Sequence, residues 1–285
     1  MNAAPTIAVR GTVVPSFLYG TAWKEQETER LVRLALEAGF RGVDTANQRK
    51  HYVEAGVGAA VRRAIADGLV RREDLFLQTK FTSVGGQDQR LPYDPGAAPA
   101  IQVRQSFASS LEHLGVEQID SYVIHGPSSG RGLNGYDREV WRTMEELHAA
   151  GQARFLGISN VALEQLEKLC EHAVVQPSFV QNRCFARDGW DSAVRSFCRE
   201  HGIVYQGFSL LTANVRDLQN PAFFQLVDRL GKTPAQVVFR FAHQIGMLPL
   251  TGTTDPEHMS EDLDGLGFEL ADEDMRLIEG IAGRS

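Results

Sequence analysis

The chain has 285 residues, a length that fits either two modest domains or one large α/β barrel. Its 43% hydrophobic and 23% charged residues are ordinary for a globular protein and exclude disordered and fibrous classes. The net charge of −7 argues against non-specific binding to nucleic acid or to an anionic membrane, because both need a basic surface.

Apolar segments and cysteines indicate the cellular compartment. No stretch of about 18 apolar residues is present, and the first 20 residues lack a basic segment followed by a long apolar core. The three cysteines, Cys170, Cys184 and Cys198, form no CxxC pair, so they support neither a disulfide framework nor a zinc cluster. We therefore expect a cytoplasmic protein with no metal site and no membrane or nucleic-acid partner.

In chain order, the first predicted element is a hairpin. Ile7–Arg10 and Val13–Val14 flank Gly11 and suit a short hairpin that plugs the bottom of a barrel. Eight apolar runs follow, each ending in a polar or small residue and leading into an amphipathic helical stretch. Such runs are typical of parallel strands covered by helices. They are Phe17–Gly20, Arg41–Asp44, Leu75–Lys80, Ile119–His125, Arg154–Ser159, Phe179–Asn182, Ile203–Ser209 and Met247–Gly252.

The stretches between these runs have helical periodicity. Leu31, Leu34, Ala35 and Ala38 share one face, and Gly39 is a stop signal behind them. Another helix is predicted over Pro234–Gln244, with proline in its first turn. No linker divides the chain, so we predict one domain over residues 1–285, a (β/α)8 TIM barrel with an N-terminal β-hairpin plug. The alternative is a doubly wound open sheet, which would carry a glycine-rich first turn if it bound a dinucleotide.

Motifs for several other chemistries are missing or misplaced. Gly231-Lys232-Thr233 lacks the upstream glycine of a phosphate-binding loop, and no GxSxG or HExxH is present. Gly56-Val57-Gly58 lies inside a predicted helix, so we interpret it as a helix-packing feature and not as a dinucleotide turn.

The informative residues end three successive predicted strands. These are Asp44, Lys80 and His125, and Tyr52 lies just after the first of them. Barrel enzymes hold their chemistry at the carboxyl ends of the strands. A phenol near pKa 10 is a poor acid at pH 7, but an adjacent ammonium group lowers that pKa, and a carboxylate holds the ammonium. With a histidine bonded to the substrate oxygen, this set suits protonation of an alkoxide as hydride reaches a carbonyl carbon.

The chain resembles the aldo-keto reductase family over nearly its whole length. The segments that carry the resemblance are Gly39–Ala46, Glu73–Lys80, Gln118–Pro127, Phe155–Asn160, Gln181–Asn182, Thr233–Gln236 and Phe268–Met275. The resemblance implies a barrel that binds extended NADPH or NADP without a Rossmann domain, with NADH as a possible substitute. It also implies a small-molecule carbonyl substrate.

By this resemblance, Asp44, Lys80 and His125 match three of the family's four catalytic residues. The fourth is normally a tyrosine five residues after the aspartate, where this chain has Arg49. The loop here is longer by two residues, and counting back from Glu54 places His51 at that position with Tyr52 beside it. We predict Tyr52 as the general acid, because it is the loop's only phenol. The alternative is that His51 or a water molecule supplies the proton.

The resemblance also implies a set of cofactor contacts. Ser159, Asn160 and Gln181 match the residues that bind the nicotinamide carboxamide, Phe208 would stack beneath the ring, and Ser209, Leu210 and Leu211 would follow the pyrophosphate. Relatives that prefer NADPH place Lys and Arg at positions held here by Gly252 and His258, so we expect weaker selectivity for the 2′-phosphate. The remaining expected contacts are Thr21, Thr253, Glu261 and Asp262, the last two with adenine.

The substrate pocket is predicted from aromatic residues. Trp23, His51, Phe81 and Tyr93 are expected to line it, and the loop from Phe81 to Pro99 to act as a lid. The end of the chain at Ser285 leads us to expect an open site for bulky or varied carbonyls. We predict NAD(P)H-dependent reduction of an aldehyde or ketone. Two alternatives remain: a cofactor-binding regulatory protein with little turnover, and a non-redox proton-transfer enzyme.

Overall fold

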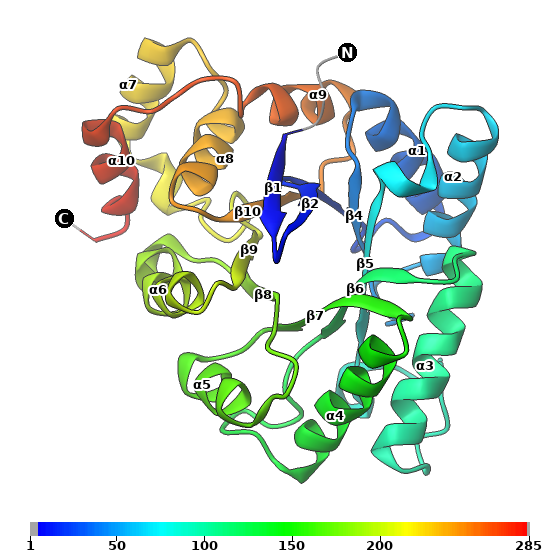
Figure 1. The fold of residues 1–285 in the computed structure, drawn as a ribbon. Coiled ribbons are helices and arrows are strands. Elements are labelled where there is room, and N and C mark those ends of the chain that lie inside the picture. Colours follow the sequence, from blue (N-terminus) through cyan, green and yellow to red (C-terminus); the bar gives the residue numbers. More distant parts are fainter. Residues whose placement is uncertain (1–4, 284–285) are drawn as a thin grey trace.

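Eight parallel strands close into a barrel in the computed structural model, which describes residues 5–283 (Figure 1). Around the barrel the strands follow the order β10-β3-β4-β5-β6-β7-β8-β9. Both ends of each strand lie within one residue of the ends of a predicted apolar run. The closure of the barrel excludes the alternative of a doubly wound open sheet. The strands are β3 (Leu18–Gly20), β4 (Gly42–Asp44), β5 (Phe76–Phe81), β6 (Ile119–Ile124), β7 (Ala153–Ser159), β8 (Phe179–Arg183), β9 (Val204–Phe208) and β10 (Leu248–Thr251).

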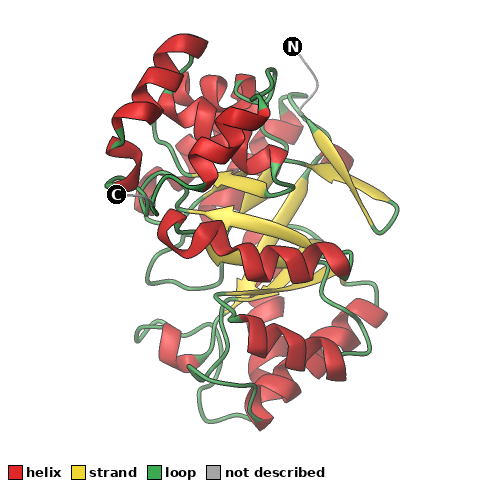
Figure 2. Ribbon diagram, turned by 90° about the vertical axis from the view of Figure 1, so that its left-hand side faces the viewer, coloured by secondary structure: helices red, strands yellow, loops and turns green. Residues whose placement is uncertain are grey.

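Helices cover the outside of the barrel (Figure 2). They are α1 (Thr28–Ala38), α2 (Glu54–Ala66), α3 (Pro99–Leu114), α4 (Gly135–Ala149), α5 (Leu163–His172), α6 (Ser192–Glu200), α7 (Pro221–Leu230), α8 (Pro234–Gln244), α9 (Pro256–Asp264) and α10 (Asp272–Glu279). Gly39 ends α1 with a φ of 118°, a conformation that glycine adopts without a steric cost. Pro234 begins α8 as predicted, and the Thr233 hydroxyl caps it by accepting a bond from the Gln236 N–H. Within residues 5–283, no helix has both the length and the apolar character to cross a bilayer.

The N-terminal hairpin closes the bottom of the barrel. Strands β1 (Thr6–Val9) and β2 (Thr12–Pro15) pair antiparallel, and Gly11 turns the chain between them at a φ of 82°. Val9 and Val14 belong to one core cluster with residues from the amino ends of barrel strands, among them Phe76 and Phe179. The predicted plug is therefore confirmed.

Close helix packing explains the paired glycines of α2. A Cβ atom added to Gly58 would lie 2.0 Å from the carbonyl oxygen of His113 on α3. A Cβ atom on Gly56 would lie 3.0 Å from Thr28. The glycines let α2 approach its neighbours, which confirms the packing interpretation.

Candidate active site

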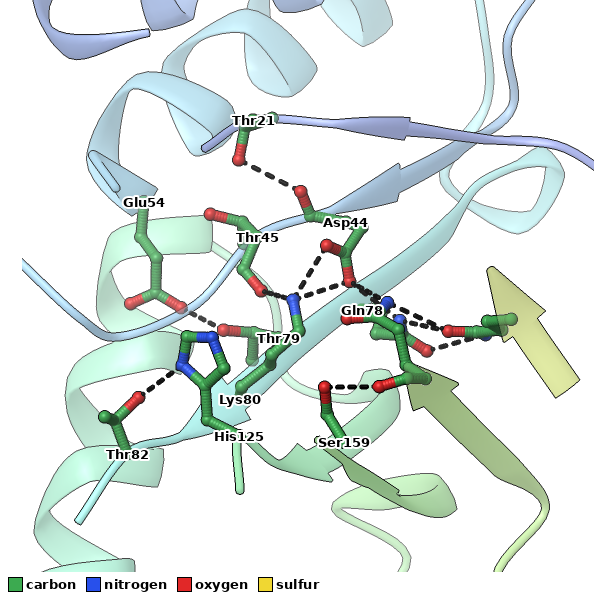
Figure 3. Close-up of polar contacts among 12 residues, drawn as sticks. Thr21, Asp44, Thr45, Glu54, Gln78, Thr79, Lys80, Thr82, His125 and Ser159 are labelled. Atoms are coloured by element: carbon green, nitrogen blue, oxygen red, sulfur yellow. Dashed lines mark hydrogen bonds and ion pairs between the residues drawn. The ribbon is translucent and has the colours of Figure 1, made fainter. Parts of the chain in front are cut away.

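A buried ion pair lies at the carboxyl end of the barrel (Figure 3). The Lys80 ammonium donates to both carboxylate oxygens of Asp44, at 2.7 Å each, and to the carbonyl oxygen of Thr45 at 2.8 Å. All three of its N–H bonds are therefore used. Burial lowers the pKa of Lys80, and the Asp44 charge opposes that shift.

Two buried glutamines bind the same carboxylate, and a third buried glutamine binds both of them. Gln78 and Gln181 each donate from Nε2 to Asp44 Oδ1, at 2.7 and 3.0 Å, and each also donates to Oε1 of Gln206. These bonds fix the direction of the Gln181 amide. Its Oε1 atom has no partner within residues 5–283, and Gln181 borders the cleft described below. Sequence reasoning missed Gln78 and Gln206, although a glutamine inside an otherwise apolar strand run was a signal.

His125 follows strand β6 and is held by a hydroxyl that the sequence analysis also missed. Its Nδ1 atom lies 2.7 Å from Thr82 Oγ1. Burial, with help from the charge of Lys80, lowers the pKa of His125 to about 3, so the imidazole is neutral at pH 7. When the Thr82 hydroxyl donates to Nδ1, the single ring proton lies on Nε2 and is available to a substrate oxygen.

Tyr52 lies in the active-site region with the other three catalytic candidates. Its ring contacts His125 edge to face, with centroids 5.8 Å apart, and the Lys80 ammonium lies 5.4 Å from the ring centroid. Within residues 5–283 the Tyr52 hydroxyl has no hydrogen-bond partner, so Lys80 does not bind it. Burial, followed by the Asp44 charge, raises the pKa of Tyr52. We expected Lys80 to lower that pKa, but burial outweighs an ammonium that Asp44 already neutralises.

One continuous cleft of about 1070 Å³ joins these catalytic candidates to the predicted cofactor positions. The lining includes Trp23, and most of the predicted residues border it: Asp44, Tyr52, His125, Ser159, Asn160, Gln181, Phe208, Ser209, Leu210, Leu211, Gly252, Thr253, His258, Glu261 and Asp262. Lys80 lies behind this surface. Thr21 also lies behind it and donates from its hydroxyl to the Asp44 carbonyl oxygen at 3.0 Å.

Three residues predicted for the substrate pocket are not among the residues that line the cleft. Phe81 and Tyr93 are buried and pack on each other, with ring centroids 5.6 Å apart, and the structure does not bring them to the cleft. His51 is not part of the cleft lining either. In the described chain, no residue of the loop from Phe81 to Pro99 borders the cleft.

The backbone is strained at several points around the cleft. Trp23, Asn160 and Ser209 are non-glycine residues with positive φ angles of 62°, 51° and 57°. Such conformations cost of order 1–3 kcal/mol each and gather at functional sites. The turn at Ser209 leaves the N–H groups of Leu210 and Leu211 without a hydrogen-bond partner in residues 5–283, beside the cleft.

The far end of the cleft lies beside α9. Asp262 is buried and accepts a bond of 2.7 Å from the Thr251 hydroxyl. Burial raises the pKa of Asp262 to about 6. His258 and Glu261 border the same end of the cleft from α9.

The chain forms a closed (β/α)8 barrel, and a long cleft lies over a buried lysine–aspartate pair. These features are typical of barrel enzymes that act at the carboxyl ends of their strands. The chain belongs to the aldo/keto reductase family, whose model matches residues 16–282. An aldo-keto reductase of Mycobacterium tuberculosis is 33% identical over 281 residues, covering 98% of this chain and 92% of its own.

Solved structures have the same fold. A Brucella melitensis aldo/keto reductase has a TM-score of 0.84 at 25% identity, covering 99% of both chains. A Bombyx mori aldo-keto reductase in complex with NADP has a TM-score of 0.82 at 24% identity, covering 100% of this chain and 95% of that chain. The family uses NADP(H) and acts on small-molecule carbonyl compounds, and membership indicates that this chain is an oxidoreductase.

Proposed function

We propose that the protein reduces an aldehyde or ketone to an alcohol with NADPH, and that Tyr52 is the general acid. The observation that carries this proposal is the continuity of the cleft. A single cavity is lined by Tyr52, His125 and Gln181 and also by His258 and Asp262 of α9. An extended dinucleotide fits such a cavity better than a small substrate alone does.

The groups along the cleft fit the cofactor chemically. The unpaired Oε1 of Gln181 is an acceptor suited to the NH2 of a carboxamide, and Asn160 borders the same part of the cleft. The Phe208 ring offers an aromatic face there. The free N–H groups of Leu210 and Leu211 suit phosphate oxygens, since successive backbone amides in a tight turn attract anions.

When bound, NADPH would supply hydride to the carbonyl carbon, and the protein's own groups would orient and protonate the carbonyl oxygen. The neutral His125 donates a hydrogen bond from Nε2 and orients the carbonyl. Tyr52 then transfers its proton to the developing alkoxide, and its raised pKa keeps that proton on the free enzyme. The Lys80 charge, 5.4 Å from the ring centroid, stabilises the phenolate that remains, and Asp44 holds Lys80 in place.

The entrance of the cleft suits an apolar substituent on the substrate. Trp23 borders the cleft and is 69% exposed, which is unusual for a residue of this size. A flat apolar side chain at the mouth favours aromatic or bulky aliphatic aldehydes and ketones over small polar ones.

The test combines a binding assay with a turnover assay. We expect NADPH to bind and to be consumed when a panel of aldehydes and ketones is supplied, with deuterium passing from labelled NADPH to the product alcohol. NADPH binding without consumption across the panel would favour the regulatory alternative. Exchange of substrate protons with solvent, without oxidation of NADPH, would favour non-redox proton transfer.

A further inference from the structure

Lys24 is a buried cation on the cleft wall that the sequence analysis did not single out. It lies between β3 and α1, is 7% exposed and borders the cleft. Its ammonium donates to the carbonyl oxygen of Gly252, just after β10. The β3–β10 pairing, with Thr251 opposite Tyr19, brings these two loops together.

No acidic partner accompanies this ammonium group. Within residues 5–283, Lys24 forms no ion pair with any carboxylate, and its only hydrogen-bond acceptor is the Gly252 carbonyl. Burial lowers the pKa of Lys24, as expected for a cation without a neutralising charge. Buried charges in proteins are normally paired, so an unpaired ammonium facing a cleft indicates an anionic ligand.

The position of Lys24 relates directly to the missing side chain of Gly252. A Cβ atom added to Gly252 would lie 3.8 Å from Lys24 Nζ. The ammonium therefore lies close to the space that a side chain at 252 would enter. Thr253 and His258, whose hydroxyl and imidazole can also bind a phosphate, border the same cleft.

We propose that Lys24 is the residue that selects the 2′-phosphate of NADP(H), reaching from the β3–α1 loop to supply the charge that position 252 lacks. This inference rests on the proposed use of NADPH. It also revises the expectation of weak selectivity, because one of the two missing cations is replaced from another loop. A charge-assisted bond to phosphate is among the stronger hydrogen bonds in proteins, so its loss is measurable.

The experiment compares Lys24→Met with the wild type in direct binding of NADPH and NADH, followed by tryptophan fluorescence and by calorimetry. We expect the Kd for NADPH to rise about tenfold or more and the Kd for NADH to change less than about threefold. Lys168→Met, on the exposed surface of α5, is the matched control and should change neither. Circular dichroism checks that each variant is folded.

A reciprocal variant makes the test independent of any general damage. In Lys24→Met/Gly252→Lys the ammonium comes from the other side of the same space, and the NADPH preference should return. Lys24→Arg should keep the preference. Equal weakening of both nucleotides by Lys24→Met, or no weakening of either, would overturn the inference. If the wild type binds neither nucleotide, the proposed function fails first, before Lys24 is in question.

Discussion

The Trp23 indole stacks on the His51 imidazole, with ring centroids 3.7 Å apart and an angle of 36° between the planes. The backbone carbonyl oxygen of His51 also accepts a hydrogen bond of 2.7 Å from the backbone N–H of Trp23. These contacts hold His51 in the loop at the cleft entrance, while the adjacent Tyr52 borders the cleft beside Asp44 and His125. The longer loop is therefore compatible with a phenol in the site. The positions of the two side chains favour Tyr52 over His51 as the proposed acid.

Replacing Lys80 separates the catalytic role that we propose for it from its contribution to stability. In Lys80→Met we expect kcat to fall about 10²-fold or more, the usual scale for acid–base assistance. The variant should also lose stability, because Asp44 becomes a buried carboxylate without its cation. Asp44→Asn/Lys80→Met removes both charges and should regain stability without regaining turnover. Near wild-type kcat in a folded Lys80→Met protein would contradict the assignment.

The lowered pKa of His125 predicts a sensitivity to acid. In the unfolded chain a histidine takes up a proton near pH 6.5, whereas His125 in the native protein does so only near pH 3. The unfolded state therefore binds more protons than the native state between these values. The free energy of unfolding falls as the pH drops from 6.5 towards 3. We expect urea midpoints of His125→Gln to depend less on pH in this window. An unchanged pH dependence would show that His125 titrates normally.

Asp262 predicts the opposite pH dependence. Its pKa is raised to about 6 from 3.8, so its contribution to stability is present below pH 3.8 and is lost as the pH rises through 6. Asp262→Asn should therefore raise Tm more at pH 8 than at pH 4. The exposed neighbour Asp264 supplies the control, since Asp264→Asn should show no such difference. A larger gain at pH 4 would contradict the burial argument.

Gly58 tests the packing of α2 on α3. Gly58→Ala places a Cβ atom against the His113 backbone, which cannot move away as a flexible side chain does. We expect the free energy of unfolding to fall by about 1–3 kcal/mol, the usual cost of overpacking. Gly135→Ala at the start of α4, where nothing lies within 4 Å, should be neutral or stabilising. Equal effects of the two substitutions on Tm would show that the contact is relieved easily.

Local signals made the fold predictable. The apolar runs indicated the strands. Gly39 and Pro234 indicated helix boundaries, because a helix end depends on residues close to it in the sequence. The misplaced pocket residue Phe81 also has a local reason. Successive side chains of a strand point to opposite faces, so Phe81 turns outward because Lys80 turns inward.

Contacts between distant parts of the chain were not predictable in the same way. Lys24 and Gly252 are 228 residues apart in the sequence, and only the closure of the barrel brings them together. Thr82 and His125 are likewise 43 residues apart, and the pairing of β5 with β6 sets their separation. The spacing of residues along one segment carries no information about such pairs.

The most direct test of the mechanism compares Tyr52→Phe with His51→Ala in carbonyl reduction and in NADPH binding. Tyr52→Phe keeps the ring and removes only the proton, so kcat should fall about 10²-fold or more while the Kd for NADPH stays unchanged. His51→Ala removes the stacking partner of Trp23 and should lower kcat less than about tenfold. The reverse ranking, with His51→Ala nearly inactive and Tyr52→Phe active, would contradict the assignment of Tyr52 as the general acid.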